Sequence, residues 1–379
     1  MAEQQEASLG KVHVPLGKDG EGLYTEKTKG CFDVIAAATP MVLDALSKVP
    51  APSAGSAFTI ADYGTADAGT SLPLMYTIVE KMRSSGNTGD IQINYEDQAN
   101  NEWKSVFAHA YGHLQVPGVK SFYKDFQNVF VTGCGEGFHS QCYPAGSIML
   151  GVSFTAMHWL SQNACNIKGA LHSTQSEPAE KATFIAQAEK DFEKIMLARS
   201  KELCKGGQLV VVNFAESKEG YYLGWSGDGA NMHANFAKLW RELVDKKVIT
   251  EEEFEKCTFF NHYRTEEEQL KPFQPGNPVY ESGLRLIKHE TKVVPCPYKL
   301  KMKAGEFKGT PEEYAEWFYC TTRTWSNSTF FSGLSESRPE AERLKIVEDF
   351  WASYRALIAK DPAAHGMDYC HTYLHIEKV

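Results

Sequence analysis

The chain has 379 residues and a formal net charge of −9 at pH 7. That length is enough to bury one large hydrophobic core or two smaller ones. The acidic balance and the lack of any cluster of lysine and arginine argue against nucleic acid as a partner, because binding to a polyanion rests on clustered positive charge.

The sequence predicts no membrane span, secretory signal or metal motif. The best apolar run, residues 147–154, is far shorter than the ~20 residues that a spanning helix needs, and the N-terminus lacks the basic and then apolar pattern of a signal peptide. The nine cysteines are odd in number, widely scattered and without a C-x2-C pair. They indicate reduced thiols in a cytoplasmic protein rather than disulfides or a zinc site.

The first half of the chain predicts alternating helices and strands. Residues 1–23 are polar and glycine-rich, and we expect a flexible N-terminal arm there. Beyond it, apolar residues three or four apart predict helices, and short apolar or alternating runs predict strands. The helices are predicted from Tyr24 through residue 38 and at 72–83, and the strands at 58–61, 91–95, 128–131 and 148–154.

The clearest helix is predicted at 180–204, with Gly206 and Gly207 as its C-terminal cap. A β-branched, buried strand follows at 208–214. Helices that alternate with buried strands favour a mostly parallel sheet covered by helices on both faces.

The remainder of the chain is predicted to be mostly helical. Capping patterns that begin at Thr250 and Thr310 start two helices, and an amphipathic helix covers 340–360. The alternation over 369–376 predicts an edge strand. We therefore predict an α/β fold with a cofactor-binding core at 24–215, completed by 366–379, and a mostly helical, substrate-binding cap at 216–365.

The first motif with chemical content is the turn that follows the strand at 58–61. Small residues here let a ligand approach the backbone. The turn lacks the G-x-G-x-x-G pattern of dinucleotide enzymes, and Asp67 stands between Gly64 and Gly69, where a carboxylate would repel a pyrophosphate. A cofactor with a cationic sulfonium and an amino acid tail tolerates acids there, so the motif favours a methyltransferase over a dinucleotide oxidoreductase.

The second motif is Glu96-Asp97, at the end of the next strand. An acid at this place can accept hydrogen bonds from both hydroxyls of a ribose. The alternative is an acid that caps the helix expected to start near Asn101. The two strand ends together would place a nucleoside at the point where the strand order of the sheet reverses.

Six segments, in order along the chain, match motifs of one plant enzyme family. Residues 153–161, Ser-Phe-Thr-Ala-Met-His-Trp-Leu-Ser, are the most specific match and are similar to S-S-Y-S-L-H-W-L-S. Residues 60–64, Ile-Ala-Asp-Tyr-Gly, look like the cofactor loop I-A-D-L-G. The other segments are 24–28 (S-Y-A-x-N-S), 97–107 (D-L-P-x-N-D-F-N-x-x-F), 137–144 (S-F-Y-x-R-L-F-P) and 198–207 (R-S-x-E-L-x-x-G-G). The chain therefore resembles the SABATH family, the salicylic acid, benzoic acid and theobromine methyltransferases.

The resemblance implies a methyltransferase that depends on S-adenosylmethionine, with a Rossmann-like sheet and a helical cap over the active site. Asp97 would contact the ribose, Gly137 and Phe138 the adenine, and His158 and Trp159 would hold the acceptor as the catalytic pair. The positions that match the cofactor site are Tyr24, Asp62, Gly64, Asp97, Gln98, Gly137, Phe138, Ser153 and Phe154. The positions that match the substrate pocket are Cys31, His158, Trp159, Met232, Tyr263 and Tyr369.

Four positions depart from the family pattern. Cys31 stands where carboxyl-methylating members carry a glutamine that binds the acceptor carboxylate, and a thiol is a poor donor. Gly137 replaces the usual serine, and Met232 stands where a tryptophan is common. Lys256 lies near the place where some members present a metal-linked acid, so no magnesium site is predicted.

A carboxylate acceptor suits a site without an evident general base. Carboxylic acids have pKa values of about 4 and are ionised at pH 7, so the protein mainly has to position the acceptor and exclude water during in-line transfer. We expect O-methylation of a small-molecule carboxylate. N-methylation of a small amine or heterocycle is one alternative, and a cofactor-binding protein without activity is another. We expect neither nucleic acid nor membrane as a partner, and assembly as a homodimer stays open.

Overall fold

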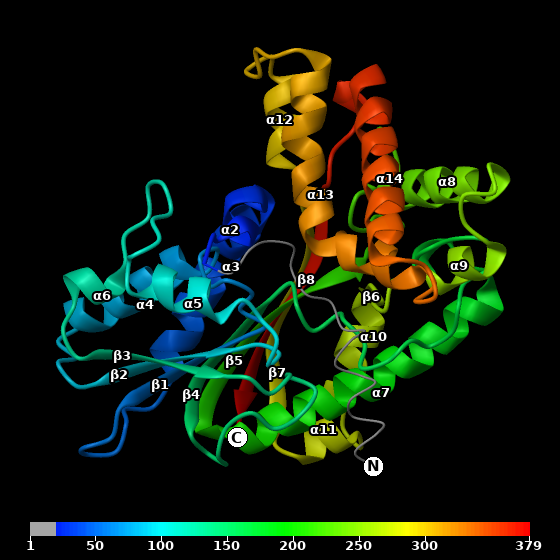
Figure 1. Cartoon of the computed structure of the whole chain (residues 1–379). Helices are drawn as coiled ribbons and strands as arrows, with labels where there is room; N and C mark the ends of the chain where they lie inside the picture. The colour runs from blue at the N-terminus through cyan, green and yellow to red at the C-terminus, as the bar shows by residue number, and fades with distance from the viewer. Residues whose placement is uncertain (1–19) are drawn as a thin grey trace.

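The computed structural model describes residues 20–379 and is built around one mixed β-sheet (Figure 1). The strand order is β3-β2-β1-β4-β5-β8-β7, and the short β6 pairs with β5. The strands are β1 (Phe58–Tyr63), β2 (Ile91–Glu96), β3 (Val129–Cys134), β4 (Ile148–Phe154), β5 (Leu203–Glu216), β6 (Arg264–Thr265), β7 (Leu284–Val294) and β8 (Tyr369–Lys378). The predicted flexible arm lies almost wholly outside the described residues.

The helices fall into two groups along the chain. Those of the first half are α2 (Leu23–Lys27), α3 (Lys29–Lys48), α4 (Leu72–Ser84), α5 (Trp103–Ala110), α6 (Phe122–Asp125) and α7 (Pro178–Glu202). Those of the second half are α8 (Met232–Asp245), α9 (Glu251–Lys256), α10 (Glu266–Leu270), α11 (Pro278–Glu281), α12 (Pro297–Lys303), α13 (Pro311–Gly333) and α14 (Glu340–Lys360). The predicted helices at 72–83 and 340–360 are confirmed, whereas the first predicted helix is divided at Thr28 into α2 and α3.

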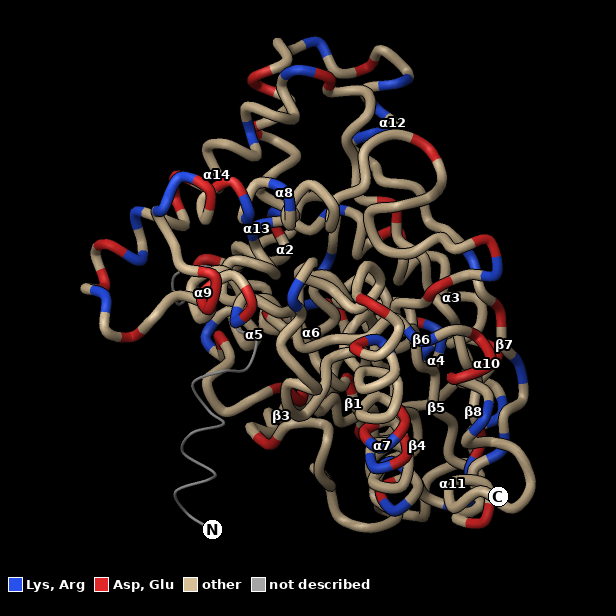
Figure 2. Tube along the Cα trace, turned by 90° about the vertical axis from the view of Figure 1, so that its right-hand side faces the viewer, with Lys and Arg blue, Asp and Glu red and all other residues tan. Residues whose placement is uncertain are grey.

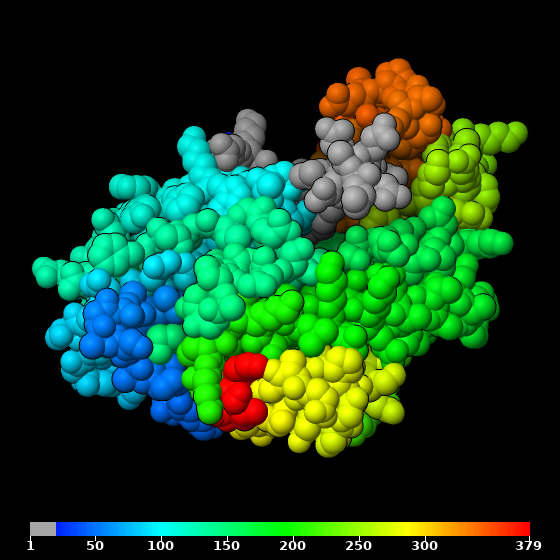
Figure 3. Space-filling model, turned by 90° about the horizontal axis from the view of Figure 1, so that it is seen from below, coloured from blue at the N-terminus to red at the C-terminus, as the bar shows by residue number. Residues whose placement is uncertain are grey.

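The sheet is mostly parallel, as predicted. Strands β1 to β5 pair in parallel, and β8 and β7 are antiparallel. Successive residues of a strand point to opposite faces, so β5 places Val210 and Val212 in the core with α3 and α4, and Leu209 and Val211 in the core with α7. Both faces are therefore covered by helices. In Figure 3 the yellow segment around α11 lies beside the red C-terminal residues, as the pairing of β7 with β8 requires.

Helix α3 combines a central position with an apolar composition. By length and composition it could cross a membrane, but such evidence is weak for a single helix near the N-terminus. Its residues Val34, Ala38 and Val42 are fully buried in the main core, and it contacts β4, β5 and β8. Gly30 allows the closest approach, because a Cβ at this position would lie 2.2 Å from the ring of Tyr369. These contacts are those of a core helix.

The predicted strand at 369–376 is confirmed as β8, but its predicted place at the edge of the sheet is wrong. β8 lies between β5 and β7, and its residues up to Ile376 are buried. Its alternating polar residues face partners instead of water: the hydroxyls of Thr372 and Thr291 lie 2.8 Å apart, and His375 Nε2 lies 2.7 Å from the side-chain oxygen of Gln208. The edge is formed by β7, within the segment predicted to be mostly helical.

The predicted glycine cap of the helix at 180–204 is also wrong. α7 ends at Glu202, and Leu203 already has an extended backbone and begins β5. Gly206, with φ of +76°, lies in the irregular start of β5, where the register against β4 shifts. The two glycines therefore serve a strand irregularity rather than a helix end.

Helices α8, α9 and α12 to α14 gather on one side of the molecule (Figure 1). Their core is aromatic: the ring of Phe330 lies 4.1 Å from that of Phe350 and 5.2 Å from that of Trp240. α13 packs against α14 and also against α2. The division of the chain into a core and a cap stays a prediction, with β7 as a strand that the second segment contributes to the sheet.

Candidate active site

The site begins where β1 and β4 end, at the point where the strand order reverses. Gly64 directly follows β1 with φ of +73°, and a Cβ on it would lie only 2.3 Å from the Cβ of Ala156, which follows β4. The same Cβ would lie 3.8 Å from Cε1 of Phe138. Ligands of open α/β sheets bind in the crevice at this reversal point, so Gly64 and Phe138 lie where a cofactor is expected.

Asp62 and Ser153 stabilise the ends of β1 and β4. Asp62 is 2% exposed and accepts hydrogen bonds from Ser71 Oγ at 2.7 Å and Thr65 Oγ1 at 3.3 Å. Burial raises the pKa of Asp62 to about 6, although both hydroxyls lower it. Ser153 is buried and donates to the carbonyl oxygen of Tyr63 at 2.9 Å. The hydrogen bonds of these two side chains therefore go to other residues of the protein and fix the backbone around the turn.

The end of β2 presents two adjacent acids. Asp97 accepts from the backbone N–H of Ala66 and of Gln98, each at 2.8 Å, and burial raises its pKa to about 6. Glu96 is fully buried, and its Oε2 accepts from the N–H of Gly64 at 3.0 Å. Burial, followed by the charge of Asp97, raises the pKa of Glu96 well above its usual range. The sequence predicted a role for Asp97, but the direct link from Glu96 to the turn emerges only in the folded chain.

Asp67 accepts hydrogen bonds from α2, and the repulsion of a pyrophosphate predicted from it stays a prediction. Its carboxylate accepts from Thr25 N at 2.9 Å and from Thr25 Oγ1 at 2.5 Å, and it is 2% exposed. The residues on either side, Ala66 and Ala68, have φ of 51° and 62°. This backbone conformation therefore places the Asp67 carboxylate against Thr25 of α2.

His158 and Trp159 lie on the turn after β4, which pairs with residues 260–262. His262 N donates to His158 O at 3.1 Å, and Trp159 forms an antiparallel bridge with Asn261. This pairing brings the ring of Tyr263 within 6.0 Å of His158, and the ring of Phe214, at the end of β5, within 4.6 Å. The structure thus unites His158 with Tyr263, as predicted, and adds Phe214.

Tyr24, Cys31 and Tyr369 form the neighbouring part of the site. The hydroxyl of Tyr24 lies 3.8 Å from Cys31 Sγ. Burial raises the pKa of Cys31 to about 11, so it is a neutral thiol at pH 7. The ring of Tyr369 stacks 6.1 Å from Phe214, which connects this group to the group around His158.

Neutral imidazoles form the wall behind Tyr263. His233 Nε2 lies 3.2 Å from the Tyr263 hydroxyl, and the ring of His172 lies 4.2 Å from the Tyr263 ring. Burial lowers the pKa of His233 and His371 to about 3 and that of His172 well below its usual value. Met232 packs against Gly224 at the start of α8, whereas its neighbour His233 reaches Tyr263. The sequence did not single out His172, His233 or His371, because isolated histidines far apart in the chain carry no signal of their contact.

Among residues 20–379, no group of three or more His, Cys, Asp or Glu side chains is arranged to hold a metal ion. The polar groups of the site are instead two adjacent acids at the end of β2, a neutral thiol and several neutral imidazoles. Such groups can bind hydroxyls and orient a small acceptor among aromatic rings.

A model of the SAM dependent carboxyl methyltransferase family matches residues 11–273. The chain belongs to this family. The matched region includes the turn at Gly64, the acids of β2 and the His158-Trp159 pair, and it confirms the resemblance to the SABATH methyltransferases.

Curated relatives come from plants. Loganic acid O-methyltransferase of Catharanthus roseus is 26% identical over 257 residues, which are 62% of this chain and 65% of that protein. Probable 7-methylxanthine methyltransferase 3 of Theobroma cacao is 28% identical over 214 residues, 51% of this chain and 56% of that protein. The matched segments thus span about half to two thirds of the relatives' own length.

The methyltransferase fold is also found in a solved structure. Loganic acid methyltransferase with SAH has a TM-score of 0.72 and 20% sequence identity, over 96% of this chain and 98% of that chain. This likeness confirms the predicted α/β fold.

Proposed function

We propose that the protein transfers a methyl group from S-adenosylmethionine to the carboxylate of a small molecule. The observation that carries the proposal is the carboxyl methyltransferase match over residues 11–273, because it spans both halves of the candidate site. Asp97 is assigned to the ribose and Phe138 to the adenine, and His158 and Trp159 are assigned to the acceptor. The protein would act on a small molecule in the cytoplasm, without a nucleic acid or membrane partner.

The chemistry of the site fits a carboxylate acceptor. A carboxylate is already ionised at pH 7, so the transfer needs no base, and the sulfonium carries its own leaving group. The aromatic rings around His158 would fix the acceptor oxygen in line with the methyl group and keep water away. The neutral His172, His233 and His371 add no competing charge.

N-methylation of a small amine or heterocycle is the second candidate. It is favoured by Cys31, which replaces the glutamine donor of carboxyl-methylating members with a neutral thiol, and by the named 7-methylxanthine methyltransferases among the relatives. Burial among aromatic rings would keep an amine neutral, as its attack requires.

Titration calorimetry tests the cofactor assignment. We expect S-adenosylhomocysteine to bind in the micromolar range and NAD not to bind, since the acidic turn from Asp62 to Gly69 lacks the G-x-G-x-x-G pattern of dinucleotide enzymes. Asp97→Ala should weaken binding of S-adenosylhomocysteine by roughly 2–3 kcal/mol, the scale for a lost hydrogen bond to a charged group.

Asp90→Ala is the matched control, because Asp90 is exposed just before the start of β2, far along the strand from Asp97. It should leave the affinity unchanged. Binding of NAD without binding of S-adenosylhomocysteine would overturn the proposal, and an unchanged affinity in Asp97→Ala would move the ribose contact to Glu96 or to another acid.

A further inference from the structure

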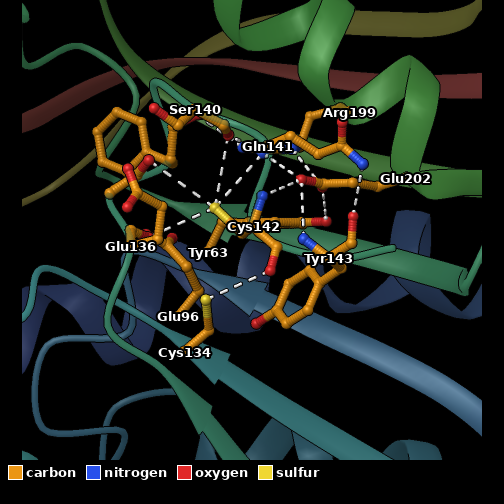
Figure 4. A network of polar contacts seen from close by, with 12 residues as sticks. Tyr63, Glu96, Cys134, Glu136, Ser140, Gln141, Cys142, Tyr143, Arg199 and Glu202 are labelled. Carbon is orange, nitrogen blue, oxygen red and sulfur yellow. Dashed lines mark hydrogen bonds and ion pairs between the residues drawn. The ribbon is translucent and has the colours of Figure 1, made fainter. Parts of the chain in front are cut away.

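A buried ion pair on α7 binds the loop that carries Phe138. Arg199 and Glu202 are both fully buried, and Arg199 NH2 lies 2.7 Å from Glu202 Oε1. Figure 4 shows the two side chains beside Ser140, Cys142 and Tyr143, in a network of polar contacts that extends to Cys134. This loop connects β3 to β4 and places Phe138 beside Gly64.

Arg199 binds the loop through two backbone carbonyls. Its NH1 donates to Phe138 O at 2.8 Å and its NH2 donates to Ser140 O at 2.7 Å. The Nε and NH2 groups also donate to both oxygens of Glu202. The planar guanidinium thus binds the two carbonyl oxygens and the Glu202 carboxylate at the same time, which a lysine ammonium cannot do in this geometry.

Glu202 extends the same network to the end of β1. Its carboxylate accepts from Cys142 N at 2.5 Å and from the hydroxyl of Tyr63 at 2.6 Å. Tyr63 directly precedes Gly64, and the Arg199 guanidinium lies 4.2 Å from the centroid of the Tyr63 ring. The ion pair therefore holds the Phe138 loop and the Gly64 turn relative to each other.

A buried ion pair is a poor means of gaining stability alone, because the loss of water around both charges can exceed their attraction. A pair that binds two carbonyls, two N–H groups and one hydroxyl on two different segments instead fixes the relative positions of those segments. Aromatic rings bind the flat face of nucleobases by stacking, worth about 1–3 kcal/mol per base, and stacking depends on the position of the ring. Phe138 is the aromatic ring that the pair positions at the strand reversal.

We propose that Arg199, supported by Glu202, is a positioning residue for the cofactor and sets Phe138 against its adenine. The inference rests on the proposed function, because it presumes an adenosyl cofactor at this turn. Arg199 does not touch the cofactor; it acts through the carbonyl of Phe138.

Arg199→Lys tests the inference, since lysine keeps the charge beside Glu202 and loses the two-carbonyl fork. Calorimetry should show that S-adenosylhomocysteine and 5′-methylthioadenosine, which lacks the amino acid tail, both bind about tenfold more weakly. In a Phe138→Ala background, Arg199→Lys should change either affinity less than twofold, because the ring through which it acts is gone. A merely structural role of Arg199 would give the same loss in both backgrounds.

Arg264→Lys is the matched control. Arg264 is also buried and also donates to backbone carbonyls, those of Met157 and Ala188, but these lie outside the Phe138 loop. Its substitution should leave the affinity for S-adenosylhomocysteine within twofold. An equal loss in Arg264→Lys would overturn the inference, because it would show general loosening.

Glu202→Gln provides a second variant should Arg199→Lys fail to fold. Glutamine keeps an oxygen for Cys142 N but no longer holds the guanidinium by charge, so it should give the same loss for both ligands and the same dependence on Phe138. An unaltered affinity in these variants, with a wild type that binds S-adenosylhomocysteine, would overturn the positioning role alone. A wild type that does not bind it would overturn the proposed function on which the inference rests.

Discussion

At the scale of single residues, Gly64 and Gly137 differ in what they allow. A side chain at Gly64 would need a positive φ and would meet Ala156 at 2.3 Å, whereas a Cβ at Gly137 meets nothing within 4 Å. The family's usual residue at the second position is serine. The two glycines are therefore expected to respond in opposite ways to substitution.

We predict that Gly64→Ala lowers the affinity for S-adenosylhomocysteine at least tenfold. The left-handed backbone alone costs about 1–2 kcal/mol for a residue with a Cβ, and Ala156 would have to move. Gly137→Ser should fold normally and bind the ligand as tightly as the wild type or more tightly. Calorimetry on both variants, with melting temperatures as a check on folding, measures this difference. Equal losses would mean that the turn at Gly64 has no special place in the site.

The residues of the site could be predicted where a motif carried them, and only there. Gly64, Asp97, Phe138 and His158 stand in contiguous segments whose spacing is informative, and the structure places them at neighbouring strand ends. Phe214 and His371 were missed because their contact depends on the antiparallel register of β5 and β8. The partner of Asp67 could not be predicted, because a single acid in a turn can face either side, and here Thr25 offers it two donors.

At the scale of elements, the turn after β1 stores backbone strain in order to hold α2. Ala66 and Ala68 both have a left-handed backbone, and Asp67 between them binds Thr25 at the middle of α2. α2 carries Tyr24, which contacts Cys31. The turn thus links the cofactor side of the site to the acceptor side.

We predict that Ala66→Gly raises the free energy of unfolding by about 0.5–1 kcal/mol, because glycine adopts the left-handed backbone without a Cβ clash. The matched control is Ala36→Gly on the exposed face of α3, which should lower that free energy by roughly 0.5–1 kcal/mol. Denaturant unfolding of both variants gives the two signs. Destabilisation by both would contradict the strained turn.

Strand order was the element-level feature that the sequence did not reveal. The apolar runs predicted the parallel strands β1, β2 and β4, because nearly all of their residues are buried. β8 was predicted at an edge because its polar residues alternate, yet the Thr372 hydroxyl and His375 Nε2 have partners on β7 and β5. Because buried polar side chains can bind one another, an alternating polar pattern does not by itself show that a strand is exposed to water.

At the scale of the whole molecule, the second half of the chain contributes to both the sheet and the site. It supplies β7, and it supplies Tyr263 and His233 beside His158. Figure 2 shows lysine and arginine interspersed with aspartate and glutamate along the chain, including α14 and α7. The candidate site therefore lies where residues of the second half, Tyr263 and His233, meet the strand ends of the first half.

We propose that the first and second halves of the chain together form a site that methylates a carboxylate. The most direct test incubates the wild type and methyl-labelled S-adenosylmethionine with a panel of small carboxylic acids and heterocyclic amines, and then treats the products with mild base. A methyl ester releases its label as methanol, whereas an N-methyl group keeps it. We predict transfer to at least one acid, with the label released by base. Base-stable label on an amine, with no transfer to any acid, would contradict the claim.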